Sequence, residues 1–492
     1  MNKILSYLNI LSFFVVAYLI IRFINISFYL NNYELLFIDE RIIINDIYNV
    51  WYLEDEFYRY TEINNQFLKN LLIVITEFAY GGDLRYGRIW SNIFIILLGP
   101  LSLINDELLI TSVRIFTMFI YFLSIQLLIN IFLDKQYRWL YSIIFYSIPG
   151  VFYFNTAPKP DPLVILFIGI SIYFLKKNKY NLSLLILGIA TGIKIVGIFA
   201  LLIVFLYILI IRKYDLTLTL IFKMLFHSWI GLVLANPILI IPPVNIGNLP
   251  NFYKIYYNWL DTQSMVAQQK RFSLDYFINW SENISIHFSY GLIKNVSLTF
   301  LIIALFIYLI YLMIINQQHA SSLITMVGLI HLLFIFISVE RQWKVYLNFS
   351  FIFLFIGLLS LLSNKKNSSI FLLVFYLTIV PLGLFRISQQ IDSKSSIPND
   401  DFKNIPSVIE HIENKYKELD NPINIVLWDP SYGMPRNNVT YESFFDVREN
   451  WEDQNLIAIL NKADFFVTKD EKNFDGIIYH KIGDFFVYQK IN

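Results

Sequence analysis

Three charged residues, Asp39, Glu40 and Arg41, stand directly after an almost uncharged segment that runs from Ile4 to Ile38. Adjacent carboxylates can act as a base that abstracts a proton, and a neighbouring guanidinium can keep them ionised. Ionisable groups at the edge of a membrane are therefore candidates for a functional site. Interfacial Asp and Glu residues also end many membrane helices without any catalytic role, so position alone leaves both interpretations open.

Further basic side chains could hold a phosphate, and the candidates are Arg341, Lys344, Lys159, Lys194, Arg85 and Arg88. Arg341 is the first choice, because a guanidinium can bind a phosphate in a bidentate manner and because Trp343 and Tyr346 follow it. Glu340 can instead be its ion-pair partner. Lys194 interrupts an apolar stretch, so it requires a polar cavity, a partner carboxylate or the lipid headgroups.

Lys159 and Asp161 flank Pro160 in a rigid turn that also contains Pro158 and Pro162. Asp161 can position a donor or an acceptor, but an Asp after a proline is also an ordinary first-turn anion of a helix. The six His residues show no His-x-x-x-His spacing, so a zinc centre is not expected. We expect no cofactor, and a requirement for a divalent metal is left open.

The composition is that of a polytopic membrane protein, with 57% hydrophobic residues, 15% charged residues and a mean hydropathy of +0.56 over 492 residues. A net charge of +1 excludes an overall basic surface of the kind that binds nucleic acid. Because the chain has no Cys, disulfides, thiolate metal sites and cysteine nucleophiles are excluded. The N-terminal apolar run lacks a small-residue cleavage site, so we expect a retained first helix.

We expect about eleven transmembrane helices, since roughly 20 apolar residues are needed to cross a bilayer. The predicted spans are 4–23, 111–133, 138–155, 161–175, 181–193, 195–211, 217–241, 297–315, 321–338, 345–363 and 369–387. The short segment 89–104 either crosses or lies at the interface. The interfacial interpretation is favoured, because it keeps the basic 176–179 turn on the cytoplasmic side with Lys3.

The expected fold is an α-helical polytopic membrane domain over 1–387, followed by a small extracytoplasmic α/β domain over 388–492. Two large outer loops, 24–110 and 242–296, would share the outer face with Asp39, Asp161 and Arg341. In the second domain the patterns predict helices over 407–419 and within 456–460, a strand over 423–428, and a hairpin over 477–491 that turns at Gly483 and Asp484.

The order of these features resembles the GT-C superfamily of membrane glycosyltransferases. The resemblance rests on Asp39-Glu40 after the first apolar run, the long first loop, Lys159-Pro160-Asp161, the Gly-Ile-Ala-Thr-Gly-Ile-Lys motif at 188–194 and the basic-aromatic turn at 340–346. The pattern is most similar to the branch of the protein O-mannosyltransferases and the bacterial aminoarabinose transferases. It departs from that branch in the last turn, where no Pro follows Tyr346.

The resemblance implies an inverting transferase that moves a hexosyl or pentosyl group from a polyprenyl-phosphate donor to a glycan, lipid or protein acceptor. It gives Asp39 the role of base. Apart from the resemblance, Glu40 is the adjacent acid and can instead orient the acceptor, and the residues expected to position donor or acceptor are Asp161, Arg41, Trp343 and Tyr346. We expect a bacterial cell membrane and a cytoplasmic N-terminus. The alternative is a secondary transporter or a flippase for lipids or oligosaccharides, although the charges gather at one face and no repeated halves are evident.

Overall fold

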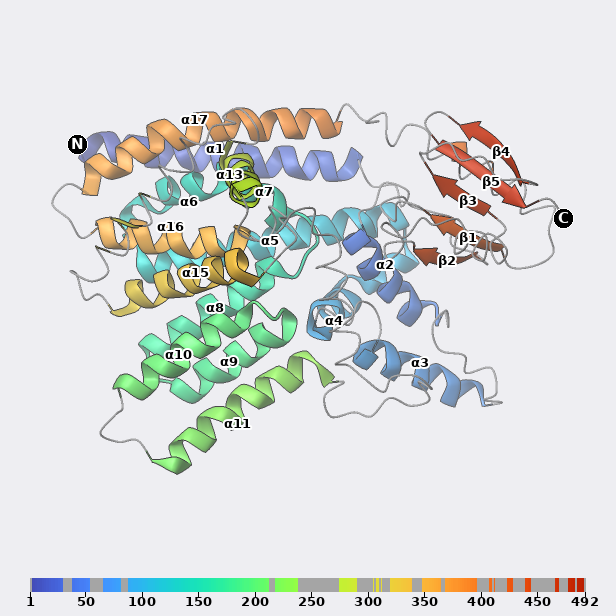
Figure 1. Cartoon of the computed structure of the whole chain (residues 1–492), viewed down its shortest axis with the longest axis horizontal. Helices are drawn as coiled ribbons and strands as arrows, with labels where there is room; N and C mark the ends of the chain where they lie inside the picture. The colour runs from blue at the N-terminus through green and yellow to red at the C-terminus, as the bar shows by residue number, and fades with distance from the viewer. Residues whose placement is uncertain are drawn as a thin grey trace.

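In the computed structural model the chain is mostly helical, with one small β-sheet (Figure 1). The structure describes residues 2–29, 38–53, 65–80, 87–211, 217–237, 274–289, 319–338, 347–363, 368–395, 423–427, 439–443, 465–468, 477–482 and 485–490, with isolated positions at 304, 307, 308, 311, 407, 408 and 411. The helices, strands and contacts of the molecule are those of these residues.

The helical part of the chain contains, in sequence order, α1 (Asn2–Tyr29), α2 (Ile38–Trp51), α3 (Gln66–Tyr80), α4 (Arg88–Leu97), α5 (Asp106–Phe132), α6 (Arg138–Tyr146), α7 (Pro149–Thr156), α8 (Asp161–Lys176), α9 (Tyr180–Ile193), α10 (Gly197–Ile211), α11 (Leu218–Ala235), α13 (Leu274–Ser289), α15 (His319–Ser338), α16 (Leu347–Ser363) and α17 (Ser368–Ser395). Two short 3-10 helices, η2 (Gly99–Leu103) and η3 (Lys135–Tyr137), precede α5 and α6.

Among the described helices, three are long and apolar enough to cross a membrane: 3–25 within α1, 107–132 within α5, and α11. Shorter apolar helices, such as α9, α10, α15 and α16, complete the helical body. Two helices begin at residues that are favoured as N-caps. Asn105 accepts hydrogen bonds from the Glu107 and Leu108 N–H groups at the start of α5, and Thr217 accepts one from the Leu220 N–H at the start of α11.

Several predicted spans differ from the observed helices. The segment 138–155 is divided into α6 and α7, because Pro149 begins a new helix after a break at Ser147 and Ile148. The segment 89–104 consists of α4 and η2, and the 10 residues of α4 reach only about 15 Å. Most of 297–315 lies outside the described residues. The helix α17 continues to Ser395, past the domain boundary predicted at 387.

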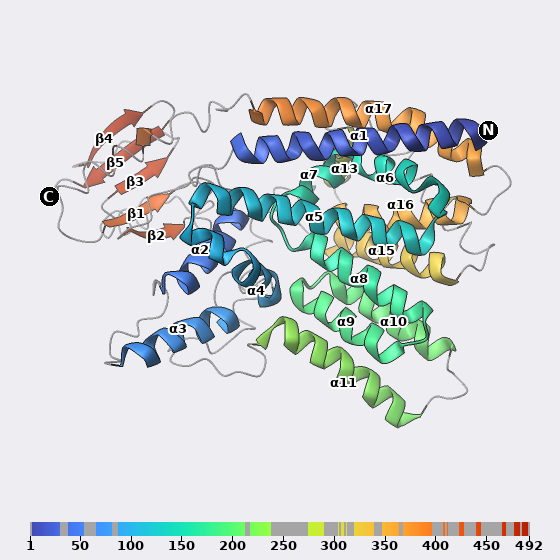
Figure 2. The ribbon, with the colours of Figure 1, turned by 180° about the vertical axis from the view of Figure 1, so that it is seen from behind.

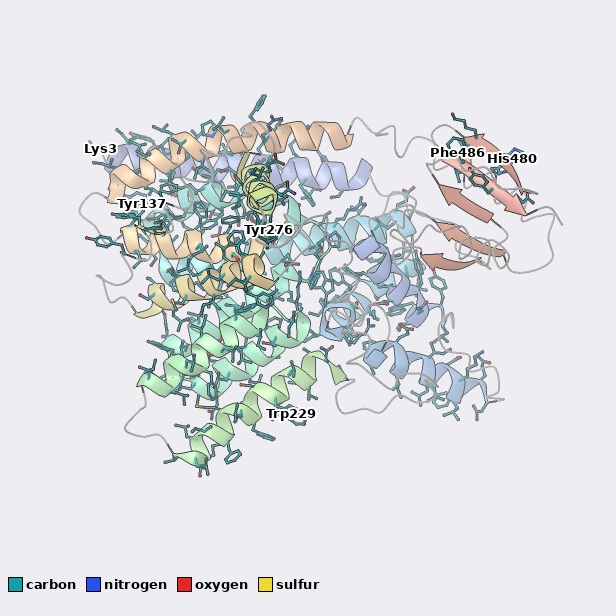
Figure 3. All side chains as sticks on the ribbon, viewed as in Figure 1. Lys3, Tyr137, Trp229, Tyr276, His480 and Phe486 are labelled. Atoms are coloured by element: carbon teal, nitrogen blue, oxygen red, sulfur yellow. The ribbon has the colours of Figure 1, made fainter. Side chains whose placement is uncertain are left out.

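The helical body has two ends that differ in what they carry. The N-terminus lies at one end, together with the turn between α5 and α6, and Figure 3 shows Lys3 and Tyr137 there. The β-sheet lies beyond the other end, where α2, α3 and α4 also gather, and Figure 2 shows the same arrangement from behind. We call these the N-terminal end and the sheet end. The helices α1 and α17 run side by side between them.

The Gly-Ile-Ala-Thr-Gly-Ile-Lys motif lies in the second half of α9, where its glycines allow a close approach of α11. A Cβ atom on Gly188 would overlap the Ser228 carbonyl oxygen, and one on Gly231 of α11 would overlap the Leu185 carbonyl oxygen. A Cβ atom on Gly192 would lie 2.5 Å from Ala235 Cβ. Small residues at such spacing let two helix backbones come together in a membrane. The motif therefore has a packing role.

The C-terminal segment forms a five-stranded sheet in the order β2-β1-β3-β5-β4. The strands are β1 (Ile423–Leu427), β2 (Val439–Ser443), β3 (Phe465–Thr468), β4 (Ile477–Ile482) and β5 (Phe485–Lys490). The first three are parallel, while β5 is antiparallel to both β3 and β4. The strand predicted over 423–428 and the hairpin turning at Gly483 and Asp484 are confirmed, whereas β2 and β3 were missed.

The predicted helix over 407–419 has helical positions at Ser407, Val408 and His411, and its remainder lies outside the described residues. The predicted helix within 456–460 lies outside them as well. The second large loop, 242–296, contains a helix that the sequence did not reveal. Its Tyr276 and Trp280 are buried, so α13 is part of the packed body rather than a loop over it.

The close contact between α9 and α11 yields a stability prediction. Replacing Gly188 with Ala should lower the unfolding temperature in detergent, even though Ala favours a helix over Gly by about 1 kcal/mol, because the added methyl overlaps Ser228 O. Leu182→Ala, at an exposed position of the same helix, is the control and should change stability little. Equal or higher stability of the Gly188 variant would contradict the packing role.

Candidate functional site

Asp39, Glu40 and Arg41 lie in the first turn of α2, not at the end of the first helix, which stops at Tyr29. Carboxylates are favoured in the first turn of a helix, because the unpaired N–H groups there carry partial positive charge. This local preference explains why charge begins at Asp39. The side chains of these three residues lie outside the described part of the structure, which gives only their backbone position at the sheet end (Figure 1).

Two turns further along α2, Asp46 forms a buried ion pair with Arg88, the first residue of α4. The Arg88 Nη1 to Asp46 Oδ2 distance is 2.9 Å, and both side chains are 2% exposed. Arg88 Nη2 donates to the backbone carbonyl of Glu77 on α3, and Asn49 Nδ2 donates to Glu77 Oε1 over 3.3 Å. These four residues, Asp46, Asn49, Glu77 and Arg88, form what we call the first-loop cluster.

The first-loop cluster joins α2, α3 and α4 into one unit. Arg88 is buried and binds Asp46 and Glu77 through its two terminal nitrogens, so it contributes to this unit, and its role as a phosphate ligand stays a prediction. Sequence analysis missed Asp46, Asn49 and Glu77. The local signal was weak, because Asp46 shares α2 with Asp39 and Glu40, and only Glu77 is the single carboxylate of its helix, α3.

A second ion pair joins Lys194 to Asp161, which is the first residue of α8. Lys194 Nζ lies 2.9 Å from Asp161 Oδ1 and 2.8 Å from Oδ2. The two side chains are 18% and 4% exposed. Of the three environments expected for Lys194, the structure therefore provides the partner carboxylate. Asp161 stands in the first turn of α8, as its ordinary role requires, and also neutralises the lysine.

The C-terminal end of α9 connects the two ion pairs. The Gly87 N–H donates to the Ile193 carbonyl over 2.8 Å, and Asn236 Nδ2 donates to the Gly192 carbonyl over 2.8 Å. Arg88 directly follows Gly87 in the chain, and Lys194 directly follows Ile193. A Cβ on Gly87 would overlap Gly192 O, so this contact requires glycine at position 87. The first loop is thus fastened to the helical body beside the Lys194–Asp161 pair.

The remaining predicted site residues are placed as follows. Lys159 is half-buried in the turn before α8, where its backbone N–H donates to the Ala157 carbonyl over 2.7 Å. Arg85, Arg341, Trp343, Lys344 and Tyr346 lie outside the described residues. The structure brings Arg88, Asp161 and Lys194 to one region, and it leaves the position of the aromatic turn unspecified. Within the described part, no group of three His, Asp or Glu residues could hold a metal ion.

Sequence analysis also missed a buried polar contact inside the helical body. His331 of α15 lies with its Nδ1 2.6 Å from Ser350 Oγ of α16, and both residues are buried. The rings of Phe199 and Phe349 pack against His331 with centroid distances of 5.2 Å and 4.8 Å. His331 thus links α15 to α10 and α16.

No protein-family model matches this chain, and no curated protein matches it either. The function proposed below therefore rests on the residues of the chain and their geometry.

The Lys194–Asp161 pair predicts a coupled effect on stability. Asp161→Asn or Lys194→Met alone should each destabilise the protein by up to about 3 to 5 kcal/mol, because each removes one member of an ion pair that is largely shielded from water. The double variant Asp161→Asn/Lys194→Met should recover most of that loss. The measurement is a double-mutant cycle of thermal or denaturant unfolding in detergent. Additive losses in the double variant would show that the two charges do not stabilise each other.

Proposed function

We propose that this protein is an integral-membrane inverting glycosyltransferase of the GT-C type. It transfers a sugar from a polyprenyl-phosphate donor to an acceptor at the outer face of a bacterial cell membrane. The proposal rests on the hydrogen bond from the Gly87 N–H to the Ile193 carbonyl, which holds the first loop against the end of α9. That contact brings the first-loop cluster beside the Lys194–Asp161 pair, and two members of the cluster lie on α2, the helix whose first turn contains Asp39.

The sidedness of charge supports the membrane orientation. Basic residues at the turns of the N-terminal end pair with aromatic rings: Arg138 with Trp139, Lys176 with Phe132, Lys177 with Tyr173 and Lys179 with Phe174. Lys and Arg are in excess in the cytoplasmic loops of membrane proteins, and aromatic side chains are common at both membrane interfaces. We therefore place the N-terminal end in the cytoplasm, and the sheet end, with the C-terminal domain, outside.

The proposed topology keeps about eleven spans, in which α6 and α7 form one broken crossing and α4 lies at the outer interface. A break in a crossing is tolerated where neighbouring helices cover it, and α7 packs against α5, α13, α16 and α17. The exposed apolar side chains of α1 and α11, among them Phe14, Phe222 and Trp229, would face lipid.

In the proposed reaction, the acceptor hydroxyl attacks the anomeric carbon of the donor from the face opposite the phosphate. Asp39 takes the hydroxyl proton while the new carbon–oxygen bond forms. The bond from the anomeric carbon to the phosphate oxygen breaks, and its electron pair stays on the lipid phosphate. That leaving group is a stable anion, so cations rather than a general acid assist its departure. Arg341, Lys344 and Lys159 are proposed for this role, with Arg85 as an additional donor.

Lys194 and Asp161 have a positioning role in this scheme. Because Asp161 already neutralises Lys194, the pair contributes a fixed dipole at the site and little net charge. Glu40 and Arg41 directly follow the base, and Trp343 and Tyr346 offer aromatic surface to the sugar or the acceptor.

The function is tested with purified protein and a panel of polyprenyl-phosphate sugars. We expect release of polyprenyl phosphate from at least one donor, and Asp39→Asn should lower its rate at least about 100-fold, the scale of lost general-base catalysis. Asp134→Asn is the matched control, because it makes the same change at the N-terminal end. Donor binding should persist in the Asp39 variant. Full turnover with Asp39→Asn would reject the assignment of the base.

A secondary transporter or flippase is the second candidate, and the buried Lys194–Asp161 pair and His331 favour it. Transporters use buried ionisable groups to couple substrate movement to protons or ions. Proteoliposomes distinguish the two functions. A transferase changes the chemical identity of its lipid substrate, whereas a transporter moves the unchanged substrate between leaflets.

A further inference from the structure

Two asparagine side chains from distant parts of the chain form a buried pair. Asn155 lies in the last turn of α7, and Asn348 is the second residue of α16. Both are fully buried. Asn155 Nδ2 donates to Asn348 Oδ1 over 2.9 Å and to the Val151 carbonyl over 2.7 Å. These two bonds use both hydrogens of the Asn155 amide.

One hydrogen-bond donor and one acceptor of the pair are not used in these bonds. The Val151 carbonyl can only accept a hydrogen bond, so the atom beside it must be the nitrogen of Asn155, and Asn348 must then present its oxygen. The remaining atoms are Asn155 Oδ1 and Asn348 Nδ2. Both are buried and have no hydrogen-bond partner in the described part of the chain.

Such buried, unpaired polar atoms destabilise a fold, and native proteins hold few of them. Two apolar side chains of similar size would fill the same space without that penalty. Folding alone therefore does not explain the pair. An ordered water or a ligand does, because either can accept from Asn348 Nδ2 and donate to Asn155 Oδ1.

The position of the pair favours a ligand. Asn155 precedes Lys159 by four residues, and Asn348 follows Lys344 by four residues, so each member of the pair is close in sequence to a proposed phosphate ligand. A third such atom, Nε1 of the buried Trp280, is on α13, which packs against α7 and α16. Figure 3 marks the position of α13 by Tyr276, whose ring lies next to that of Trp280.

We propose that Asn155, Asn348 and Trp280 bind the sugar of the donor. Asn348 Nδ2 and Trp280 Nε1 donate to sugar oxygens, and Asn155 Oδ1 accepts from a sugar hydroxyl, a group that both donates and accepts. This inference rests on the proposed glycosyltransferase function, and it assigns sugar recognition to amide and indole groups apart from the cations that hold the phosphate.

The test is the double variant Asn155→Leu/Asn348→Leu. Its unfolding temperature should equal or exceed that of the wild type, because it removes two unpaired polar atoms. Its KM for the polyprenyl-phosphate sugar should rise about tenfold or more, on the scale of one or two lost hydrogen bonds. Binding of the same polyprenyl phosphate without a sugar should not change. The control is Ser171→Ala/Ser183→Ala, which removes a buried hydroxyl pair that is already satisfied, and should leave KM unchanged.

Trp280→Phe is a second variant that keeps an aromatic ring and removes only the indole N–H. It should raise the same KM even if the double variant does not fold. An unchanged KM in the variants that fold would overturn the inference and leave an ordered water as the partner of the pair. If the wild type releases lipid phosphate from none of the donors, the proposed function is rejected, and this inference is rejected with it. The wild-type measurement therefore separates the two failures.

Discussion

The hydrogen bond between the Gly87 N–H and the Ile193 carbonyl, with an ion pair on either side of it, is the contact on which the sheet end depends. Arg88 follows Gly87 and binds Asp46, while Lys194 follows Ile193 and binds Asp161. Charges inside an apolar body are stable only when they are paired. These two pairs therefore fix the positions of α2 and α8 relative to the end of α9.

The same requirement gives the glycines of α9 their importance. Gly188 lets α9 approach α11 closely, and Gly192 lies against both Gly87 and Ala235. A larger side chain there would move the end of α9, and with it Lys194. The packing of the helices thus determines the geometry of the proposed site. The charged residues lie at helix ends, and the small residues determine how close those helices come to one another.

The sequence predicted the helical class, most helix positions, one strand and the final hairpin, because long apolar runs and turn residues are local signals. It also predicted that Lys194 requires a polar cavity, a partner carboxylate or the lipid headgroups, but it did not choose among them or identify Asp161, since pairing across 33 residues depends on tertiary packing. The contacts of Arg88 were not predicted for the same reason, because Asp46 and Glu77 reach it only when α2, α3 and α4 are brought together. The burial of α13 also became evident only from the packed structure, because the sequence assigned these residues to a large outer loop.

The central claim is that the first loop and the start of α8 share one membrane face, opposite the turn between α8 and α9. Because the chain has no Cys, single cysteines can be introduced at Tyr52, Lys159 and Lys177 without other changes. They can then be labelled in intact cells with a membrane-impermeant maleimide. The account predicts that Tyr52→Cys and Lys159→Cys react from outside, and that Lys177→Cys reacts only after the membrane is opened. Labelling of Tyr52→Cys and Lys159→Cys from opposite sides would contradict it.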